Sequence, residues 1–479
     1  MIDYTKRMTT HRELYPMSDM DISIESDRGR ILSAPAVRRL QKRTQVFALE
    51  LNASIRTRLT HSLEVGQTAR YIAKTILSRL KEEGLDRCGL EGMENAFVST
   101  AEMTSILHDI GNPPFGHFAE QTINKWMREN ALPILERLPS ELAQTQELKA
   151  LLSKDICNYD GNAQAIRVIT KLQRLNLSYM QTIAVLKYTR GAYAEKPAKG
   201  AEFDYIKKKP GFYYSEKEQI AKMQEALGIG TGHRYPITYI MEAADDISYL
   251  TADLEDSHEK GILTLEKIYR LITEECERQG ETFLLELVEK QYAKAKNNEK
   301  PYQFNMFFTL TRATLVNALV NHVADIYVEN HQAVFEGRFN AALLEYDKES
   351  PYYKAIKVLE EVSRTYIYQN KEVQTLELQG YRIVNGLLDS YKPLLELSSE
   401  DFAKLLNDEK IACFVSMRLI KRVSAKQITA YQHDVEKLKL EDESYVILEW
   451  YYRVRLITDY ISGMTDDYAL YEYKTLSAM

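Results

Sequence analysis

Imidazole and carboxylate side chains gather in the segment of residues 105–120. His108 and Asp109 stand side by side, and His117 follows after a loop that contains two consecutive prolines. These groups are nitrogen and oxygen donors that a divalent metal ion accepts in proteins. A His-Asp pair also arises by chance in buried cores, so the pair alone does not establish a metal site. The interpretation depends on further donors elsewhere in the chain.

Two other segments carry donors of the same kind. His61 falls in the first turn of a segment with helical apolar spacing, and Asp245 and Asp246 lie in a second helical segment at residues 236–259. One of these two aspartates would complete a set of two histidines and two carboxylates. Such a set suits Mn²⁺, Mg²⁺ or Fe²⁺ and contains no soft thiolate.

The segment of residues 236–259 also carries a polar stripe. Asp245, Tyr249 and Asp253 repeat at i, i+4 and i+8, which places them on one face of a helix. An ordinary amphipathic surface would give the same pattern. His117 and Glu120, three residues apart, are likewise expected to touch on one helical face. Arg58 lies near the helix N-terminus that bears His61, where unpaired amides favour an anion.

Helices must position these groups. Gly (20) and Pro (12) are scarce among 479 residues, and long segments show 3.6-residue apolar spacing, so we predict an all-α, mainly α-helical protein. One helix is expected to end at His108 and Asp109, with Gly111 as a left-handed C-cap. Another is expected to start near Ser33 and to carry Gln45 towards its end.

No composition shift, repeat or linker divides the chain. We therefore predict a single continuous helical body over residues 1–479, with a metal-binding core at about 55–260 and additional C-terminal helices at about 261–479. We find no membrane-spanning apolar run and no signal peptide, so we expect a cytoplasmic protein without a membrane partner. The four separated cysteines predict reduced thiols. The net charge of −7 argues against general nucleic-acid coating but leaves room for local basic clusters.

Several stretches together resemble one family. The order His…His-Asp…Asp is that of the HD-domain metal-dependent phosphohydrolases, and the surrounding sequence is similar to the bacterial deoxyguanosinetriphosphate triphosphohydrolases (dGTPases). The resemblance covers nearly the whole chain through the following stretches: Ser-Asp-Arg-Gly-Arg-Ile, Arg-Thr-Arg-Leu-Thr-His-Ser, His-Asp-Ile-Gly-Asn-Pro-Pro-Phe-Gly-His-Phe, Gly-Asn-Ala-Gln, Met-Glu-Ala-Ala-Asp-Asp-Ile-Ser-Tyr, Glu-Leu-Gln-Gly-Tyr-Arg and Tyr-Ile-Ser-Gly-Met-Thr-Asp.

The resemblance implies a fold, a reaction and a set of roles. It implies an HD-domain helical core and hydrolysis of dGTP, or of other dNTPs, to deoxynucleoside and inorganic triphosphate with Mg²⁺ or Mn²⁺, or Fe²⁺. The implied metal ligands are His61, His108, Asp109 and Asp245, which leaves Asp246 as a neighbour. His117 would protonate the leaving O5′, and Glu120 would orient it. The implied substrate contacts are Arg58 and Lys209 to the triphosphate, Gln45 and Asp253 to the 3′-hydroxyl, and Tyr249 to the sugar.

Other implications of the resemblance concern the base and the partners. Glu377, Lys410 and Arg418 would reach the base or phosphates. Relatives form homo-oligomers, hexamers among them, and some bind single-stranded DNA. The chain departs from many relatives at Asn112, where His is common, and at Tyr159-Asp160, where Phe-Glu is common. We expect neither departure to touch a metal ligand, although both bear on substrate or oligomer behaviour.

Two other functions remain to be weighed. Another HD-domain enzyme, a 5′-nucleotidase or phosphodiesterase, would use the same metal ligands but cut the nucleotide elsewhere. A non-catalytic nucleotide-binding or nucleic-acid-binding regulator would keep the fold without the chemistry. The complete ligand set with His117 and Glu120 argues against the regulator, and product analysis separates the two enzymes.

Overall fold

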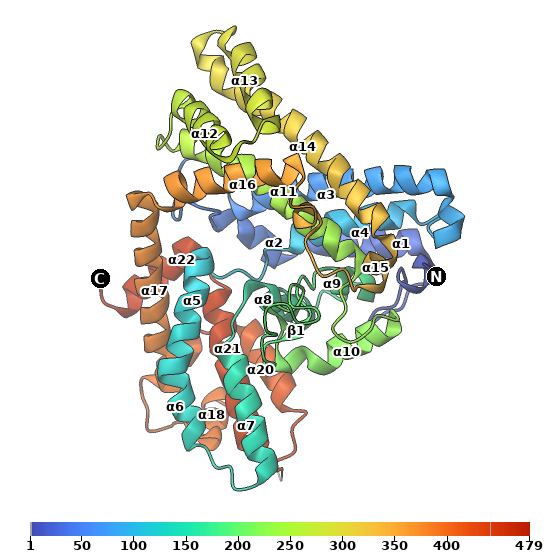
Figure 1. Ribbon diagram of the computed structural model, residues 1–479. Coiled ribbons are helices and arrows are strands. Elements are labelled where there is room, and N and C mark those ends of the chain that lie inside the picture. The colour runs from blue at the N-terminus through green and yellow to red at the C-terminus, as the bar shows by residue number, and fades with distance from the viewer. Residues whose placement is uncertain (1, 441) are drawn as a thin grey trace.

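The computed structural model describes residues 2–440 and 442–479, and these form 22 α-helices and one pair of short strands (Figure 1). The prediction of a mainly α-helical protein is confirmed. The helices up to residue 259 are α1 (Met20–Leu32), α2 (Pro35–Arg39), α3 (Arg58–Glu83), α4 (Glu94–Leu107), α5 (Gly116–Trp126), α6 (Leu132–Arg137), α7 (Ala143–Ile156), α8 (Gly161–Arg167), α9 (Tyr179–Ala184), α10 (Lys217–Ala226) and α11 (Pro236–Glu259).

The C-terminal half continues with helices throughout. They are α12 (Leu265–Gln279), α13 (Phe283–Lys296), α14 (Gln303–Glu329), α15 (His331–Glu336), α16 (Pro351–Ser363), α17 (Lys371–Leu395), α18 (Ser399–Leu406), α19 (Ser416–Leu419), α20 (Ala425–Val435), α21 (Tyr445–Ser462) and α22 (Asp466–Leu476). The strands β1 (Arg190–Gly191) and β2 (Pro210–Phe212) pair in parallel within the otherwise irregular segment that follows α9. Among the described residues, no helix is long and apolar enough to cross a membrane.

Buried apolar side chains form two hydrophobic clusters. The first is built largely by α3, α4, α11 and α14, which lie together in the upper half of Figure 1. The second is built by α5, α17 and α21, in the lower half. Helix α8 contributes to both, through Ile166 to the first and Ala163 to the second. The segment between α4 and α5, which carries His108 and Asp109, therefore crosses from one cluster to the other.

The expected helix carrying Gln45 is wrong. Helix α2 and a short 3₁₀ turn end at Lys42, and Gln45 lies in the irregular segment beyond. The helix stops because Arg43 is extended and its buried guanidinium donates to the backbone carbonyls of Ser462 and Met464, at 2.6 and 2.9 Å. The backbone amide of Thr44 then donates to Asp466. These partners lie more than 400 residues away in the chain, so local patterns do not reveal them.

The expected role of Gly111 as a left-handed cap is also wrong. Helix α4 ends at Leu107 with His108 as its C-cap, and Gly111 does not adopt a positive φ. A Cβ at Gly111 would instead meet the carbonyl oxygen of Gly161 at 2.1 Å and the amide nitrogen of Ala165 at 2.2 Å. The residue is therefore glycine because α8 packs directly against the backbone of this loop.

Candidate metal centre and nucleotide pocket

Three of the predicted ligands offer donor atoms to one point. One donor atom each from His61, His108 and Asp109 lies within 4.8 Å of the others. Asp245 of α11 joins them, since its Oδ1 lies 3.2 Å from Nε2 of His61 and 3.4 Å from Nε2 of His108. The structure thus brings all four predicted ligands together from α3, the end of α4, and α11.

Local structure aims each histidine at this point. His61 sits in the first turn of α3, which begins with a reciprocal capping box between Thr57 and Thr60. His108 directs Nδ1 at the carbonyl oxygen of Ser105, 2.6 Å away. That bond takes the Nδ1 proton, so the lone pair of a neutral His108 ring is at Nε2, facing the carboxylates.

Cations hold the two carboxylates ionised. Arg58 donates to Oδ2 of Asp109 at 2.6 Å, and Nζ of Lys187 lies 3.4 Å from Oδ2 of Asp245. Burial opposes ionisation, yet Arg58 and His108 hold the pKa of Asp109 well below its usual range. Burial likewise opposes protonation of His108, yet Asp109 and Asp245 raise its pKa to about 9. A buried group of two carboxylates and two imidazoles that attracts a positive charge fits a divalent cation.

The predicted pair of His117 and Glu120 is formed on α5. Nδ1 of His117 lies 2.9 Å from Oε2 of Glu120, and the hydrogen bond to this carboxylate raises the pKa of His117. The backbone amide of Gly161 donates to Oε1 of Glu120 at 2.8 Å. Glu120 is buried, whereas the side chain of His117 is 69% exposed. The carboxylate of Glu120 is therefore held in place by Gly161, and the imidazole of His117 is exposed.

A cavity of about 490 Å³ opens beside the metal ligands, within the range of small-molecule sites. Six of the predicted residues line it besides Asp109 and Asp245: Gln45, Arg58, His117, Tyr249, Asp253 and Glu377. The polar stripe of Asp245, Tyr249 and Asp253 on α11 thus lines this cavity and is not an ordinary solvent-exposed helix face.

Two buried acceptors in the cavity lack a partner. Among the described residues, none donates a hydrogen bond to Oε1 of Gln45 or Oδ1 of Asp253. The hydroxyl of Tyr368 donates to the other carboxylate oxygen of Asp253, and the hydroxyl of Tyr249 donates to Glu360 at 2.6 Å. Unpaired buried acceptors are unfavourable, so both are suited to a hydroxyl group on a ligand.

Lys209 lies in a different place from the other predicted substrate residues. It lines a neighbouring cavity of about 440 Å³, together with Lys208 and Arg190. His117 lines both cavities. Nζ of Lys209 lies 3.9 Å from Asp160 and its side chain is 44% exposed. Lys209 therefore lies in the neighbouring cavity, and His117 stands between it and the metal ligands.

The three residues that were expected to reach the base or the phosphates lie in different places in the structure. Glu377 of α17 lines the cavity of about 490 Å³, where burial raises the pKa of its carboxyl group. Lys410 is exposed, and Arg418 donates to the carbonyl oxygen of Phe414 beside it. Neither Lys410 nor Arg418 lines this cavity. Asp246 faces a separate small cavity with Lys187 and Glu242, and burial raises its pKa to about 8.

Sequence reasoning missed several residues of the site. In the sequence, Lys187 belongs to a basic, aromatic run without helical spacing, and Tyr368 belongs to no recognisable motif. Asn112 was expected to be away from the metal ligands, and this is wrong, because its amide nitrogen donates to Oδ1 of Asp109. The other departure also adjoins the loop, since Tyr159 donates to the carbonyl oxygen of Gly111 at 2.9 Å.

The chain is similar to known proteins over its whole length. Residues 58–158 match the HD domain family, and residues 422–475 match the phosphohydrolase-associated domain. The chain is 41% identical to the deoxyguanosinetriphosphate triphosphohydrolase of Salmonella paratyphi A, across 100% of this chain and 99% of that protein. It is 42% identical to the protein of the same name from Klebsiella pneumoniae subsp. pneumoniae, across 100% of this chain and 98% of that protein.

Proposed function

Because the chain belongs to the deoxyguanosinetriphosphate triphosphohydrolase family, we propose that it hydrolyses dGTP to deoxyguanosine and inorganic triphosphate at the cluster of His61, His108, Asp109 and Asp245. The observation that carries this proposal is the convergence of these four side chains beside a cavity of nucleotide size. The reaction adds water to the α-phosphorus and breaks its bond to O5′, so the products are a nucleoside alcohol and triphosphate.

The four side chains would hold one divalent ion, for which we propose Mn²⁺ or Mg²⁺, with Fe²⁺ as a further candidate. Oxygen and imidazole donors without thiolate favour these ions. When bound, the ion supplies charge stabilisation at the phosphate and a nucleophilic water at neutral pH. Arg58 and Asn112, which hydrogen-bond Asp109, and Ser105, which accepts from His108, orient the ligands.

His117 is the proton donor to O5′ in this proposal. An alkoxide is a poor leaving group, so the nucleoside oxygen needs a proton as its bond to phosphorus breaks. His117 lines the cavity, and Glu120 both orients its ring and favours its protonated form. Gly161 fixes Glu120 in turn, which keeps the acid in position.

The remaining cavity residues bind the nucleotide. Gln45 and Asp253 bind the 3′-hydroxyl: the unpaired carboxylate oxygen of Asp253 accepts a hydrogen bond from it, and the amide nitrogen of Gln45 donates to its oxygen. The ring of Tyr249, held by Glu360, packs against the sugar and leaves no partner for a 2′-hydroxyl. Arg58 and Lys209 contact the triphosphate from opposite sides of His117.

Product analysis tests the proposal directly. The purified protein is incubated with each of the four dNTPs and with Mn²⁺ or Mg²⁺, and the products are separated by anion-exchange chromatography. We expect deoxyguanosine and inorganic triphosphate, with dGTP as the preferred substrate. Release of monophosphate would indicate a 5′-nucleotidase or phosphodiesterase instead, and no turnover with any dNTP would indicate a binding protein.

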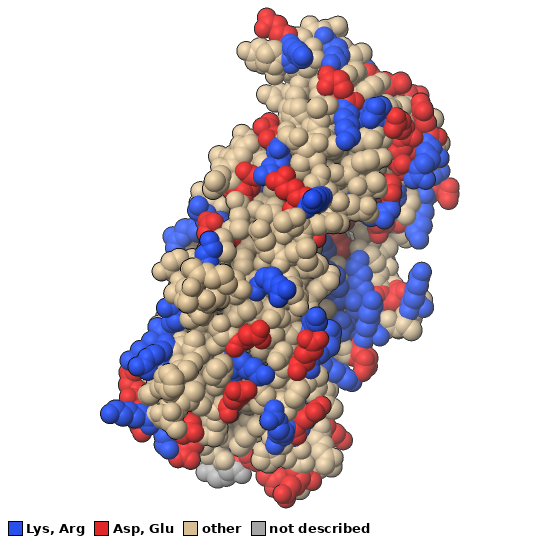
Figure 2. All heavy atoms as spheres, turned by 90° about the vertical axis from the view of Figure 1, so that its left-hand side faces the viewer, with Lys and Arg blue, Asp and Glu red and all other residues tan. Residues whose placement is uncertain are grey.

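We further propose that the chain acts as one continuous body and that it forms a cytoplasmic homo-oligomer, which family resemblance suggests is a hexamer. We also propose that this oligomer contacts single-stranded DNA. Large side chains that would suit a protein interface are exposed on α17 and α22, including Leu378 (60%) and Tyr471 (61%). Figure 2 looks onto this side, where uncharged surface extends between scattered charges of both signs. Light scattering measures the subunit number, and fluorescence anisotropy with a labelled oligonucleotide measures DNA binding.

A further inference from the structure

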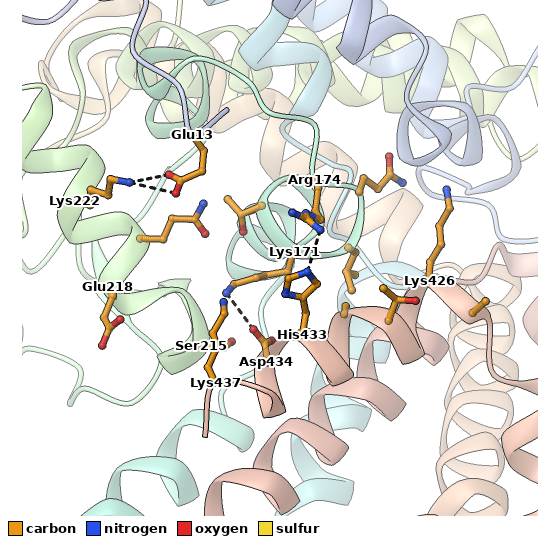
Figure 3. A pocket seen from close by; sticks show the side chains of 17 residues that line it. Glu13, Lys171, Arg174, Ser215, Glu218, Lys222, Lys426, His433, Asp434 and Lys437 are labelled. Atoms are coloured by element: carbon orange, nitrogen blue, oxygen red, sulfur yellow. Dashed lines mark hydrogen bonds and ion pairs between the residues drawn. The ribbon is translucent and has the colours of Figure 1, made fainter. Parts of the chain in front are cut away.

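A second large cavity lies away from the metal centre. It has a volume of about 610 Å³ and is bordered by α10, α20 and the π-helical turn Val168–Leu172 that follows α8 (Figure 3). No residue that lines it also lines the nucleotide cavity of about 490 Å³. The proposed hydrolysis therefore assigns this cavity no role.

Cationic side chains from separate elements converge on this cavity. We call it the basic cavity, after its five cations: Lys171, Arg174, Lys222, Lys426 and Lys437. Three carboxylates also line it, those of Glu13, Glu218 and Asp434. Positive charge is thus in excess even when His433, which lines the same cavity, is neutral.

Pairing inside the cavity leaves three of these cations available. Lys222 is paired with Glu13 at 3.0 Å, and Lys171 with the buried Asp434 at 3.2 Å. Within residues 2–440 and 442–479, no carboxylate lies within ion-pair distance of Arg174, Lys426 or Lys437. The excess charge is therefore carried by side chains that form no ion pair with a described carboxylate.

One face of α20 is turned to the cavity. Lys426, Ala430 and His433 of α20 follow each other at intervals of four and three residues, and Lys437 lies in the turn just after the helix ends at Val435; all four line the cavity. The helix and the turn after it thus place one lysine before and one after the imidazole of His433.

Arg174 stands opposite this face in an unusual backbone conformation. Its φ is +45°, a left-handed value that is unfavourable for a residue other than glycine. Nη1 of Arg174 lies 3.3 Å from Nε2 of His433, and Figure 3 shows the two side chains meeting across the cavity. The guanidinium of Arg174 therefore lies at this wall although the backbone of the residue adopts an unfavourable conformation.

We propose that the basic cavity binds a small phosphorylated anion. Arg and Lys are the side chains that recognise phosphate, and Arg does so with a planar pair of donors. The volume lies within the range of sites for small molecules. The cavity is bordered by α10, α20 and the turn Val168–Leu172, and its limited volume suits a compact ligand better than an extended nucleic-acid strand. The shared chemistry is an oligophosphate group, carried either by inorganic triphosphate or by a nucleoside triphosphate.

Site-resolved lysine protection tests the proposal on the unmodified protein. The protein is treated briefly with an amine-acetylating reagent, with and without inorganic triphosphate, and each lysine is quantified by peptide mass spectrometry. We expect saturable protection of Lys426 and Lys437. Lys290 and Lys294 of α13 are exposed and line neither cavity, so they serve as internal references. Lys209 reports binding at the metal centre separately.

A charge reversal then assigns the protection to this cavity. Arg174→Glu should raise the triphosphate concentration for half-maximal protection of Lys426 and Lys437 by tenfold or more, whereas Lys290→Glu, with the same change in charge, should not. Parallel arms with a nucleoside triphosphate, deoxyguanosine and oligothymidylate identify the source. Protection by either phosphate compound but not by deoxyguanosine supports the proposal. Unchanged acetylation in both phosphate arms, protection by oligothymidylate alone, or equal behaviour of the two variants overturns it.

Discussion

The imidazole of His117 is bound to the carboxylate of Glu120, with Nδ1 of the histidine 2.9 Å from Oε2 of the glutamate. The two residues are three apart on α5, so the helix itself brings them together. Glu120 does not move freely, because the amide of Gly161 holds its second oxygen. The negative charge of Glu120 therefore acts on His117 from a fixed position.

Glu120→Gln should shift the pH dependence of turnover. The hydrogen bond and charge of Glu120 raise the pKa of His117, so the protonated acid persists to higher pH. Activity that needs this proton is present below that pKa and is lost as pH rises through it. Without the charge, the alkaline limb of kcat should move to lower pH, which a pH–rate profile measures. An unmoved limb would show that His117 is not the titrating acid.

His117→Ala should retain metal and bind dGTP but turn over more slowly by about 10² to 10⁴. A substrate with sulfur in place of the bridging 5′ oxygen provides the control, because a thiolate leaves without a proton. We expect this substrate to recover much of the lost rate in the variant. Equal losses on the oxygen and sulfur substrates would instead assign His117 to positioning the attacking water.

His108→Ala and Asp109→Ala should each remove bound metal and hydrolysis together. Each takes one ligand from a cluster with four protein ligands, and Asp109 also anchors Arg58. Elemental analysis measures the metal, and circular dichroism checks that the helices persist. Full metal content with intact activity in both variants would refute the proposed centre.

Tyr249→Ala should admit ribonucleotides, whereas Tyr249→Phe should not. Phenylalanine keeps the ring that fills the space beside the sugar and loses only the bond to Glu360. We therefore expect the dGTP-to-GTP ratio of kcat/KM to fall in the alanine variant and to stay near the wild-type value in the phenylalanine variant. A ratio that is unchanged in both variants would mean that another residue excludes the 2′-hydroxyl.

Gly111→Ala should destabilise the protein by about 1–3 kcal/mol or more, because the new Cβ would meet backbone atoms of α8 at 2.1 and 2.2 Å. Gly29→Ala is the matched control. Nothing lies within 4 Å of a Cβ there, and the position is inside α1, so a gain of roughly 0.5–1 kcal/mol is expected. Chemical denaturation measures both. A tolerated Gly111→Ala would mean that the loop can move away from α8.

The nucleotide cavity shows how far local patterns reach. The i, i+4, i+8 spacing of Asp245, Tyr249 and Asp253 predicted a shared helical face, and α11 has the predicted bounds, Pro236–Glu259. The pattern did not reveal that this face looks into a cavity. Apolar spacing on α3 does not bury every residue that follows it: Ile72 and Ile76 are buried, whereas Leu63 is 51% exposed. At the end of a helix, apolar spacing no longer determines burial, because fewer neighbours pack there.

The sequence by itself determined the helical class, the residue types that could bind a metal, and the touching pair on α5. All of these depend on spacing within one helix or on donor chemistry. Only the tertiary structure decided that Lys187 faces Asp245 and that Asn112 hydrogen-bonds to Asp109. It also decided that Tyr368 hydrogen-bonds to Asp253, and that Lys209 lines a different cavity, which shares His117 with the first. Most of these contacts join segments far apart in the chain. Their geometry is set by the packing of the two hydrophobic clusters against each other. Such long-range packing produces no periodic pattern of residues in the sequence.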